Sequence, residues 1–174
     1  MTMLYKKVTG EKVPFLFREV SEEELREKRD THFSSWSFDF LLPKVHGNKV
    51  FALVTEFDQE TIQGLIALRL NDHPQYMCVD VDIIESAPHN KKIRNAVYNP
   101  SRYLVGVGRC LIAFACQYGI ENNLDAMQLT SKSSKLKWYT DLGGLNISGQ
   151  QIIFMEDACK ELAQSYFPRG VIWC

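Results

Sequence analysis

The sequence predicts a mixed α/β fold built as a single domain over residues 1–174. Its length is within the usual range of one domain, and no internal repeat or Gly/Ser-rich linker divides it. Strand-like segments follow one another in the first half, whereas strands and helices alternate in the second half. This order is typical of a central, mostly antiparallel sheet flanked by helices.

The individual elements follow from local patterns. Ser21 and Glu24 are spaced as a capping box, which predicts a helix that begins at residue 22. Alternating apolar and acidic residues predict a half-buried strand over residues 76–85. Residues 107–121 are apolar on nearly all sides and predict a buried helix. The other predicted strands are 15–20, 49–57, 62–70, 126–130 and 150–155, and the other helices are 133–142 and 156–166.

Composition excludes several classes of protein. Hydrophobic residues make up 45% of the chain and the formal net charge is −1, so no global attraction to nucleic acid or to an anionic membrane is expected. The five cysteines form no CxxC pair, which argues against a disulfide framework or a zinc site. No apolar stretch reaches the roughly 20 residues of a membrane span, and the first residues do not form a signal peptide. We therefore expect a cytoplasmic protein without a membrane partner.

A glycine turn precedes the buried helix. Gly106 and Gly108 allow close approach of the backbone to a ligand, and the first amides of the helix attract an anion. Arg109 lies in the first helical turn and adds a positive charge. A dinucleotide fingerprint is disfavoured because residue 111 is Leu, and the missing GK[ST] excludes a P-loop. The alternative is a tight turn without a ligand.

Three motifs in order resemble the GNAT superfamily of acyl-CoA-dependent N-acyltransferases. The cofactor motif [QR]-x-x-G-x-[GA] is matched from Tyr103 to Gly108, with Tyr103 at the position of Gln or Arg. A second motif, an aromatic-Tyr pair followed by Leu-Gly, is matched by residues 138–144. The stretch 85–90 resembles a segment after the fourth strand of some bacterial members. The resemblance covers roughly residues 49–155.

The resemblance implies a sheet that splays between its fourth and fifth strands, with the cofactor and catalytic core in residues 49–155. It implies transfer of an acetyl or other acyl group from acetyl-CoA to a primary amine by direct attack in a ternary complex, without a metal. The backbone amide of Ile84 would polarise the thioester carbonyl. The pyrophosphate would be held by the turn and the helix start, namely Leu104, Val105, Gly106, Val107, Gly108 and Arg109.

The resemblance also suggests catalytic residues. Tyr139 would protonate the leaving thiolate, although a Tyr at helical spacing also serves as core filling. Glu85 is the preferred general base, with Asp82 and His89 behind it. The alternative for Glu85 is a solvated carboxylate at the end of a strand or a carboxylate that caps a loop.

Acceptor selection is expected from the aromatic segment 32–40 and from the polar segment 86–102. Trp36 and Phe38 would line an acceptor pocket, or alternatively pack on the sheet. Lys91, Lys92 and Arg94 form a solvated face or contact a cofactor phosphate or an anionic acceptor.

The acceptor is expected to be a small molecule or a peptide, while aminoacyl-tRNA stays open and other nucleic acid is not expected. The sequence also leaves open a homodimer. The alternative function is a non-catalytic acyl-CoA-binding or regulatory module that acts through a partner.

Overall fold

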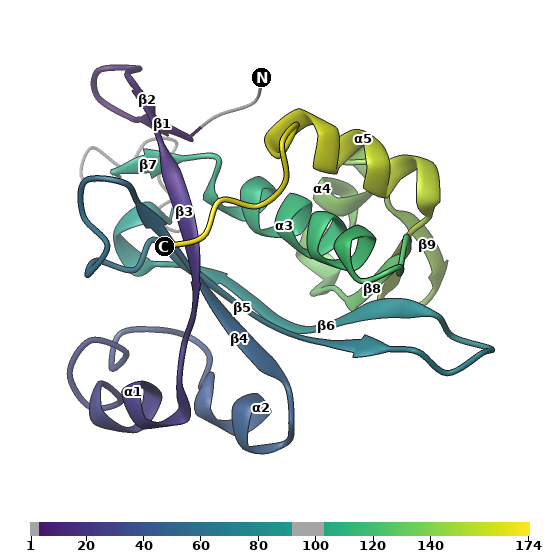
Figure 1. Cartoon of the computed structure of the whole chain (residues 1–174), viewed down its shortest axis with the longest axis horizontal. Coiled ribbons are helices and arrows are strands. Elements are labelled where there is room, and N and C mark those ends of the chain that lie inside the picture. Colours follow the sequence, from purple (N-terminus) through teal and green to yellow (C-terminus); the bar gives the residue numbers. More distant parts are fainter. Residues whose placement is uncertain (1–3, 92–102) are drawn as a thin grey trace. The chain divides into compact units, whose positions relative to one another are not determined.

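The computed structural model describes residues 4–91 and 103–174 (Figure 1). Within these residues one sheet has the strand order β3-β4-β5-β6-β8-β10-β9, and three short strands form another in the order β2-β1-β7. The pair β6–β8 is parallel, whereas β3–β4, β8–β10 and β10–β9 are antiparallel. The chain therefore has the mixed α/β fold with a mostly antiparallel sheet that the sequence predicted.

Contacts divide the chain into two compact units. Unit 1 comprises residues 1–67, 83–111 and 172–174, and unit 2 comprises residues 68–82 and 112–171. Three elements contribute residues to both units, namely β5 (Gly64–Asn71), β6 (Cys78–Ser86) and α3 (Val107–Glu121). The prediction of a single domain stays a prediction.

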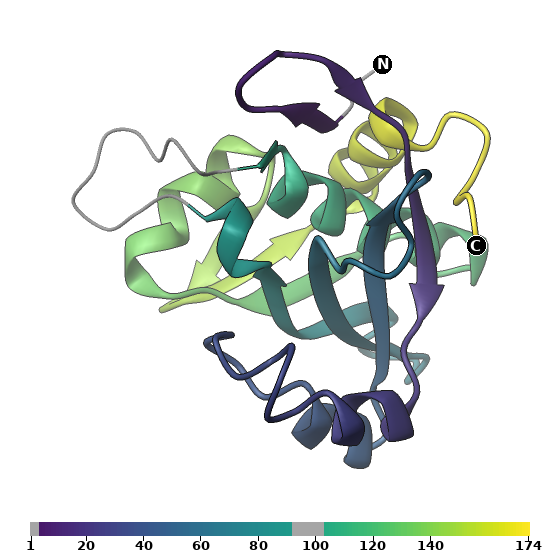
Figure 2. The ribbon, with the colours of Figure 1, turned by 90° about the vertical axis from the view of Figure 1, so that its left-hand side faces the viewer.

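Unit 1 contains the small sheet and the first strands of the large sheet. Its further elements are β1 (Leu4–Lys6), β2 (Lys12–Val13), β3 (Phe15–Glu19), β4 (Lys49–Thr55) and β7 (Leu104–Val105). Residues 172–174 lie beside β3 in both views (Figures 1 and 2), with the Phe17 amide donating to Ile172 and the Cys174 amide donating to Phe17, both at 2.9 Å. The end of the chain thus adds backbone hydrogen bonds to an edge strand.

Two short helices and the segment between them complete unit 1 (Figure 2). The helix α1 (Glu22–Glu27) begins after Ser21, whose hydroxyl accepts the Glu24 amide at 3.1 Å. The helix α2 (Leu41–Val45) follows the aromatic segment. Both helices contribute to a buried cluster with β4 and β5, and Phe33, Trp36 and Phe38 pack against it. The aromatic segment thus covers apolar surface of the sheet.

Unit 2 is built around the parallel pair β6–β8. Its elements are β8 (Met127–Thr130), α4 (Leu136–Asp141), β9 (Leu145–Ser148), β10 (Gln151–Phe154) and α5 (Glu156–Tyr166). The helix α3 approaches β6 closely at Gly119, where an added Cβ would lie 2.6 Å from the Val79 side chain. A larger residue at position 119 would push helix and strand apart.

Some boundaries differ from the sequence prediction. The capping box is only half formed, because the Glu24 carboxylate binds Arg18 and Lys28 instead of reaching back to the Ser21 amide. The helix predicted over 133–142 begins with a 3₁₀ turn, Ser133–Lys135, before α4. The strands β1, β2, β7 and β9 were not predicted, because they are too short or too exposed to produce a hydrophobic period.

Four of the five cysteines are buried, Cys174 is exposed, and all five are free thiols, as expected. Among the described helices, none combines the length and the apolar character that a transmembrane helix requires.

Candidate active site

The predicted cofactor turn joins β7 to α3 in unit 1. Gly106 has a φ of 99°, a region that favours glycine, and its carbonyl accepts the Cys110 amide at 3.0 Å as the first bond of the helix. The amides of Val107, Gly108 and Arg109 precede that bond and have no acceptor within the helix. Leu104 and Val107 are buried, whereas the Arg109 side chain is exposed. Buried anchors thus flank amides that have no acceptor within the helix, and Arg109 adds one exposed cation.

A hydrogen-bonded residue that sequence reasoning missed holds this turn. Asn90 is buried and belongs to the 3₁₀ helix η1 (Pro88–Asn90). Its Oδ1 accepts the Leu104 amide at 2.7 Å, and its Nδ2 donates to the backbone oxygen of Gln63 at 3.1 Å and to Gln63 Oε1 at 2.8 Å. The Tyr103 amide donates to the carbonyl of His89 at 3.1 Å. The start of β5, η1 and β7 are therefore tied together by one side chain.

Gly64 brings the start of α3 close to β5. A Cβ added at this glycine would lie 2.8 Å from Val107 Cγ1 and 2.9 Å from Leu111 Cδ1. A larger residue would force the side chains of Val107 and Leu111 to shift. A glycine inside a strand, such as Gly64 in the predicted strand 62–70, is the sequence signal that indicates such a close approach.

Glu85 lies near the end of β6 and is 5% exposed. Its Oε1 accepts the Ser37 amide at 2.8 Å and its Oε2 accepts the Phe38 amide at 3.0 Å. Lys91 Nζ donates to Glu85 Oε1 and, at 3.1 Å, to Ser37 Oγ. We call this set of residues (Glu85, Ser37, Phe38 and Lys91) the Glu85 clamp. It compensates the buried charge and fastens the aromatic segment to β6.

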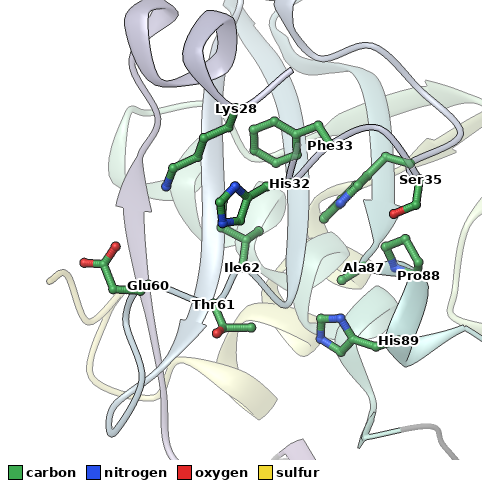
Figure 3. Close-up of a pocket in the computed structure, with 11 residues that line it drawn as sticks. Lys28, His32, Phe33, Ser35, Glu60, Thr61, Ile62, Ala87, Pro88 and His89 are labelled. Carbon is green, nitrogen blue, oxygen red and sulfur yellow. The ribbon is translucent and has the colours of Figure 1, made fainter. Parts of the chain in front are cut away.

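Two cavities of about 420 Å³ each border the aromatic segment. The first, which we call the η1 pocket, lies between this segment, the β4–β5 loop and η1; its walls include Phe33, Trp36, Ile62 and Pro88, with His32 and His89 as polar groups (Figure 3). The second is lined by Trp36 and Phe38 among others. Both predicted acceptor residues therefore border a cavity as well as packing against the core.

Tyr139 lies in unit 2, on α4. Its side chain is 8% exposed, and burial raises the pKa of the phenol to about 12. Trp138 packs edge-on against its ring, with the ring centroids 4.8 Å apart. Among the described residues, no buried side-chain oxygen or nitrogen lacks a hydrogen-bond partner. The raised pKa keeps the phenol protonated at neutral pH, which is the state that a proton donor needs.

The remaining predicted site residues are Asp82, Ile84 and the basic residues of the polar segment. Asp82 is exposed, and Ile84 lies outside the three residue pairs Val79–Met127, Asp80–Gln128 and Val81–Leu129 that join β6 to β8. Lys91 belongs to the Glu85 clamp, and Lys92 and Arg94 lie outside the described residues. In residues 4–91 and 103–174, no three His, Cys, Asp or Glu side chains are grouped so that they could hold a metal ion.

Known proteins resemble this chain in structure but not in sequence. No family model and no curated protein matches the sequence. A crystal structure of AtaTR bound with AcCoA aligns over 86% of this chain and 98% of its own, with a TM-score of 0.56 and 10% identity. The NatC complex bound to Gag peptide and CoA aligns over 82% and 98%, with a TM-score of 0.55 and 10% identity.

A GNAT-family acetyltransferase from Staphylococcus aureus Mu50 aligns over 82% of this chain and 99% of its own, with a TM-score of 0.51 and 15% identity. The chain has the GNAT fold. This confirms the fold that the sequence motifs predicted, and the GNAT resemblance now rests on structure as well as on motifs. At identities of 10–15% the likeness concerns the fold alone, because one fold hosts many activities.

Proposed function

We propose that the chain transfers an acetyl or other acyl group from acetyl-CoA to a primary amine by direct attack in a ternary complex. The observation that carries this proposal is the Gly106 turn at the start of α3 within a GNAT fold. Several structures with this fold are described as bound with AcCoA or CoA. A row of helix N-terminal amides is suited to a pyrophosphate on physical grounds as well.

In this proposal residues 104–109 hold the cofactor. Leu104 and Val107 fix the backbone, while the amides of Gly108 and Arg109 donate to the pyrophosphate. The Arg109 guanidinium is exposed and adds a charge-assisted hydrogen bond to the same anion. The Ile84 amide polarises the thioester carbonyl.

Tyr139 is the proposed acid. Its phenol donates a proton to the thiolate of coenzyme A as the carbon–sulfur bond breaks. With a pKa of about 12 the phenol carries its proton at neutral pH, so the proton is present when the thiolate leaves. A positioned general acid contributes about 10²- to 10⁴-fold in rate.

Glu85 is the first of two candidate bases, and the Glu85 clamp restricts this role. Both carboxylate oxygens already accept hydrogen bonds from backbone amides. To remove a proton from the amine, Glu85 would act through water or give up one of these bonds. Trp36 and Phe38 are proposed to contact the acceptor beside this carboxylate.

The first experiment tests donor binding and turnover. A thermal-shift titration with acetyl-CoA should raise Tm, because a ligand that binds only the folded state stabilises it. Release of coenzyme A thiol is then followed with a panel of primary amines. A Tm that does not change at high ligand excess would contradict the proposal, and binding without thiol release would favour the non-catalytic module.

The second experiment tests the acid. Tyr139→Phe should lower kcat by about 10²- to 10⁴-fold and leave the acetyl-CoA-induced Tm shift intact. Tyr166→Phe, at a buried tyrosine of α5, is the matched control and should retain kcat. Equal kcat values for Tyr139→Phe and the wild type would remove Tyr139 from the mechanism.

A further inference from the structure

His89 forms one wall of the η1 pocket. The rings of His32 and His89 lie on different sides of this cavity, with Thr61 and Ile62 also facing it (Figure 3). The apolar part of the lining comes mainly from Phe33, Trp36 and Ile62. The cavity therefore combines an apolar surface with imidazole nitrogen.

Hydrogen bonds fix the tautomer of His89. The side chain of Asn90 donates to Gln63 Oε1 at 2.8 Å, and Gln63 Nε2 donates to the Thr61 carbonyl at 3.4 Å, so that Gln63 Oε1 is an acceptor. His89 Nε2 lies 2.9 Å from the same oxygen. Nε2 must therefore carry the hydrogen and donate it. In the neutral ring Nδ1 then has a lone pair.

The surroundings keep this ring neutral. Partial burial lowers the pKa of His89 below its usual value of 6.5. The other titratable groups that line the pocket are Lys28, His32 and Glu60. Lys28 forms an ion pair with Glu24, at 2.8 Å, and Glu24 also binds Arg18. At neutral pH His89 thus offers an unprotonated nitrogen to the pocket.

A comparison with Glu85 decides between the two candidate bases. Glu85 accepts two backbone amides and is bound by Lys91. Among the described residues, His89 Nδ1 has no hydrogen-bond partner, and the side chain is exposed at the pocket. An amine needs a lone pair that it can reach. His89 offers such a lone pair without breaking a hydrogen bond of the fold.

We propose that His89 is the general base of this protein and that the η1 pocket takes an apolar or aromatic primary amine as the acceptor. This inference rests on the proposed acyl transfer. The η1 helix serves both ligands, since His89 faces the pocket and Asn90 holds the Leu104 amide of the cofactor turn.

In the proposed step the amine nitrogen attacks the thioester carbon and gives up one proton to His89 Nδ1. A nitrogen–carbon bond forms and the carbon–sulfur bond breaks. The thiolate takes a proton from Tyr139, and the products are an amide and coenzyme A. Exchange with water returns the proton of His89 to solvent and restores the proton of Tyr139.

Nuclear magnetic resonance tests the tautomer without an acceptor. Long-range ¹H–¹⁵N spectra of the full labelled chain at pH 7.5 should show His89 with a protonated Nε2 and an unprotonated Nδ1. Loss of these signals in His89→Gln assigns them. A protonated Nδ1 would overturn the proposal.

Kinetics test the role in catalysis, with 2-phenylethylamine as the probe acceptor. His89→Gln should lower kcat/KM by about 10²- to 10⁴-fold at pH 7.5. It should also make the fall in kcat/KM at acid pH less steep than in the wild type, because only protonation of the amine and no longer protonation of His89 then lowers the rate. The acetyl-CoA-induced Tm shift should be kept. His46→Gln, at an exposed histidine after α2, is the matched control and should behave as the wild type.

The outcomes separate this inference from the proposed function. If acetyl-CoA does not shift Tm of the wild type, the proposed acyl transfer fails. If the wild type releases thiol with 2-phenylethylamine and His89→Gln does so at the same rate, only the assignment of His89 fails. Acetyl-CoA binding without thiol release in the presence of 2-phenylethylamine would overturn the proposed acceptor class.

Discussion

The Gly106 turn and the Glu85 clamp are both hydrogen-bonded structures of unit 1. They differ in how far apart along the chain their hydrogen-bonded residues lie. The turn consists of consecutive residues, whose first helical bond joins Gly106 to Cys110. The partners of Glu85 are the amides of Ser37 and Phe38, which lie 48 and 47 positions away. The backbone conformation at Gly106 and the first helical bond are therefore local, whereas the clamp depends on the packing that brings two segments together.

This difference predicts different responses to mutation. A change in the turn should strain the backbone and weaken a ligand contact, with local consequences. A change in the clamp should leave buried amides without acceptors and release the aromatic segment. The two regions are thus separable by comparing cofactor binding with acceptor binding.

Among the variants of these two regions, the largest effect on acetyl-CoA affinity is expected for Gly106→Ala. A φ of 99° costs a non-glycine residue about 1–3 kcal/mol, so the turn should relax and acetyl-CoA affinity should fall by about 10- to 100-fold. Isothermal titration calorimetry measures the affinity. Gly10→Ala is the matched control, because Gly10 has a φ of 69° with open space around it, and its replacement should leave the affinity intact. Equal losses in both variants would contradict a specific role of the turn.

A smaller effect is expected for Glu85→Gln. The neutral amide provides one acceptor oxygen for two backbone amides and removes the negative charge that Lys91 contacts, so the free energy of unfolding should fall by about 1–3 kcal/mol. Urea denaturation measures this change. Glu19→Gln, at a half-exposed carboxylate paired with Lys44, should change it by less than about 1 kcal/mol.

Kinetics of Glu85→Gln distinguish a positioning role of Glu85 from a role as general base. If the clamp only positions the aromatic segment, the KM for the acceptor should rise while kcat and the pH profile are retained. If Glu85 is the base, kcat should fall and the acid side of its pH profile should change. The acetyl-CoA affinity should be unaffected in either case, which distinguishes this variant from Gly106→Ala.

The smallest effect is expected for Glu24→Gln, at a carboxylate held by cations instead of backbone amides. Hydrogen bonds from Arg18 at 2.7 and 2.8 Å, and then from Lys28, lower the pKa of Glu24 from 4.5 to about 2. Glu24 binds a proton less tightly in the folded state than in the unfolded state. The stabilisation from its ion pairs is therefore fully present above pH 4.5 and is lost as the pH falls toward 2.

The stability of Glu24→Gln should therefore be lower than that of the wild type by about 1–2 kcal/mol at pH 7, and the difference should vanish near pH 2. Urea denaturation over this pH range measures it. A difference that does not depend on pH would show that the ion pair is not its source.

Local patterns predicted part of the site. The buried helix over 107–121 has the predicted bounds, because its apolar residues recur over four turns and a glycine begins it. The Ser21 cap was predicted because the hydroxyl and the amide it accepts are three residues apart. The reciprocal bond from Glu24 was not formed, since Arg18 on the neighbouring strand β3 offers a stronger partner than an amide.

Long-range contacts decided the rest. From the sequence alone, Glu85 was a base, a solvated strand end or a loop-capping carboxylate. The solvated alternative is wrong, because Glu85 is buried and accepts the amides of Ser37 and Phe38, which the packing of the aromatic segment against β4 and β5 brings to it. The role of Asn90 and the tautomer of His89 likewise depend on Gln63, which lies 27 and 26 positions away.

The sequence by itself determined the longer strands and helices and the glycine turn before α3, because hydrophobic periods and positive-φ positions are local properties of the chain. Only the tertiary structure decided which polar side chains share a cavity and which already form hydrogen bonds within the fold. The physical reason is that a buried polar group takes whatever partner folding brings to it, and its distance along the chain does not restrict that choice.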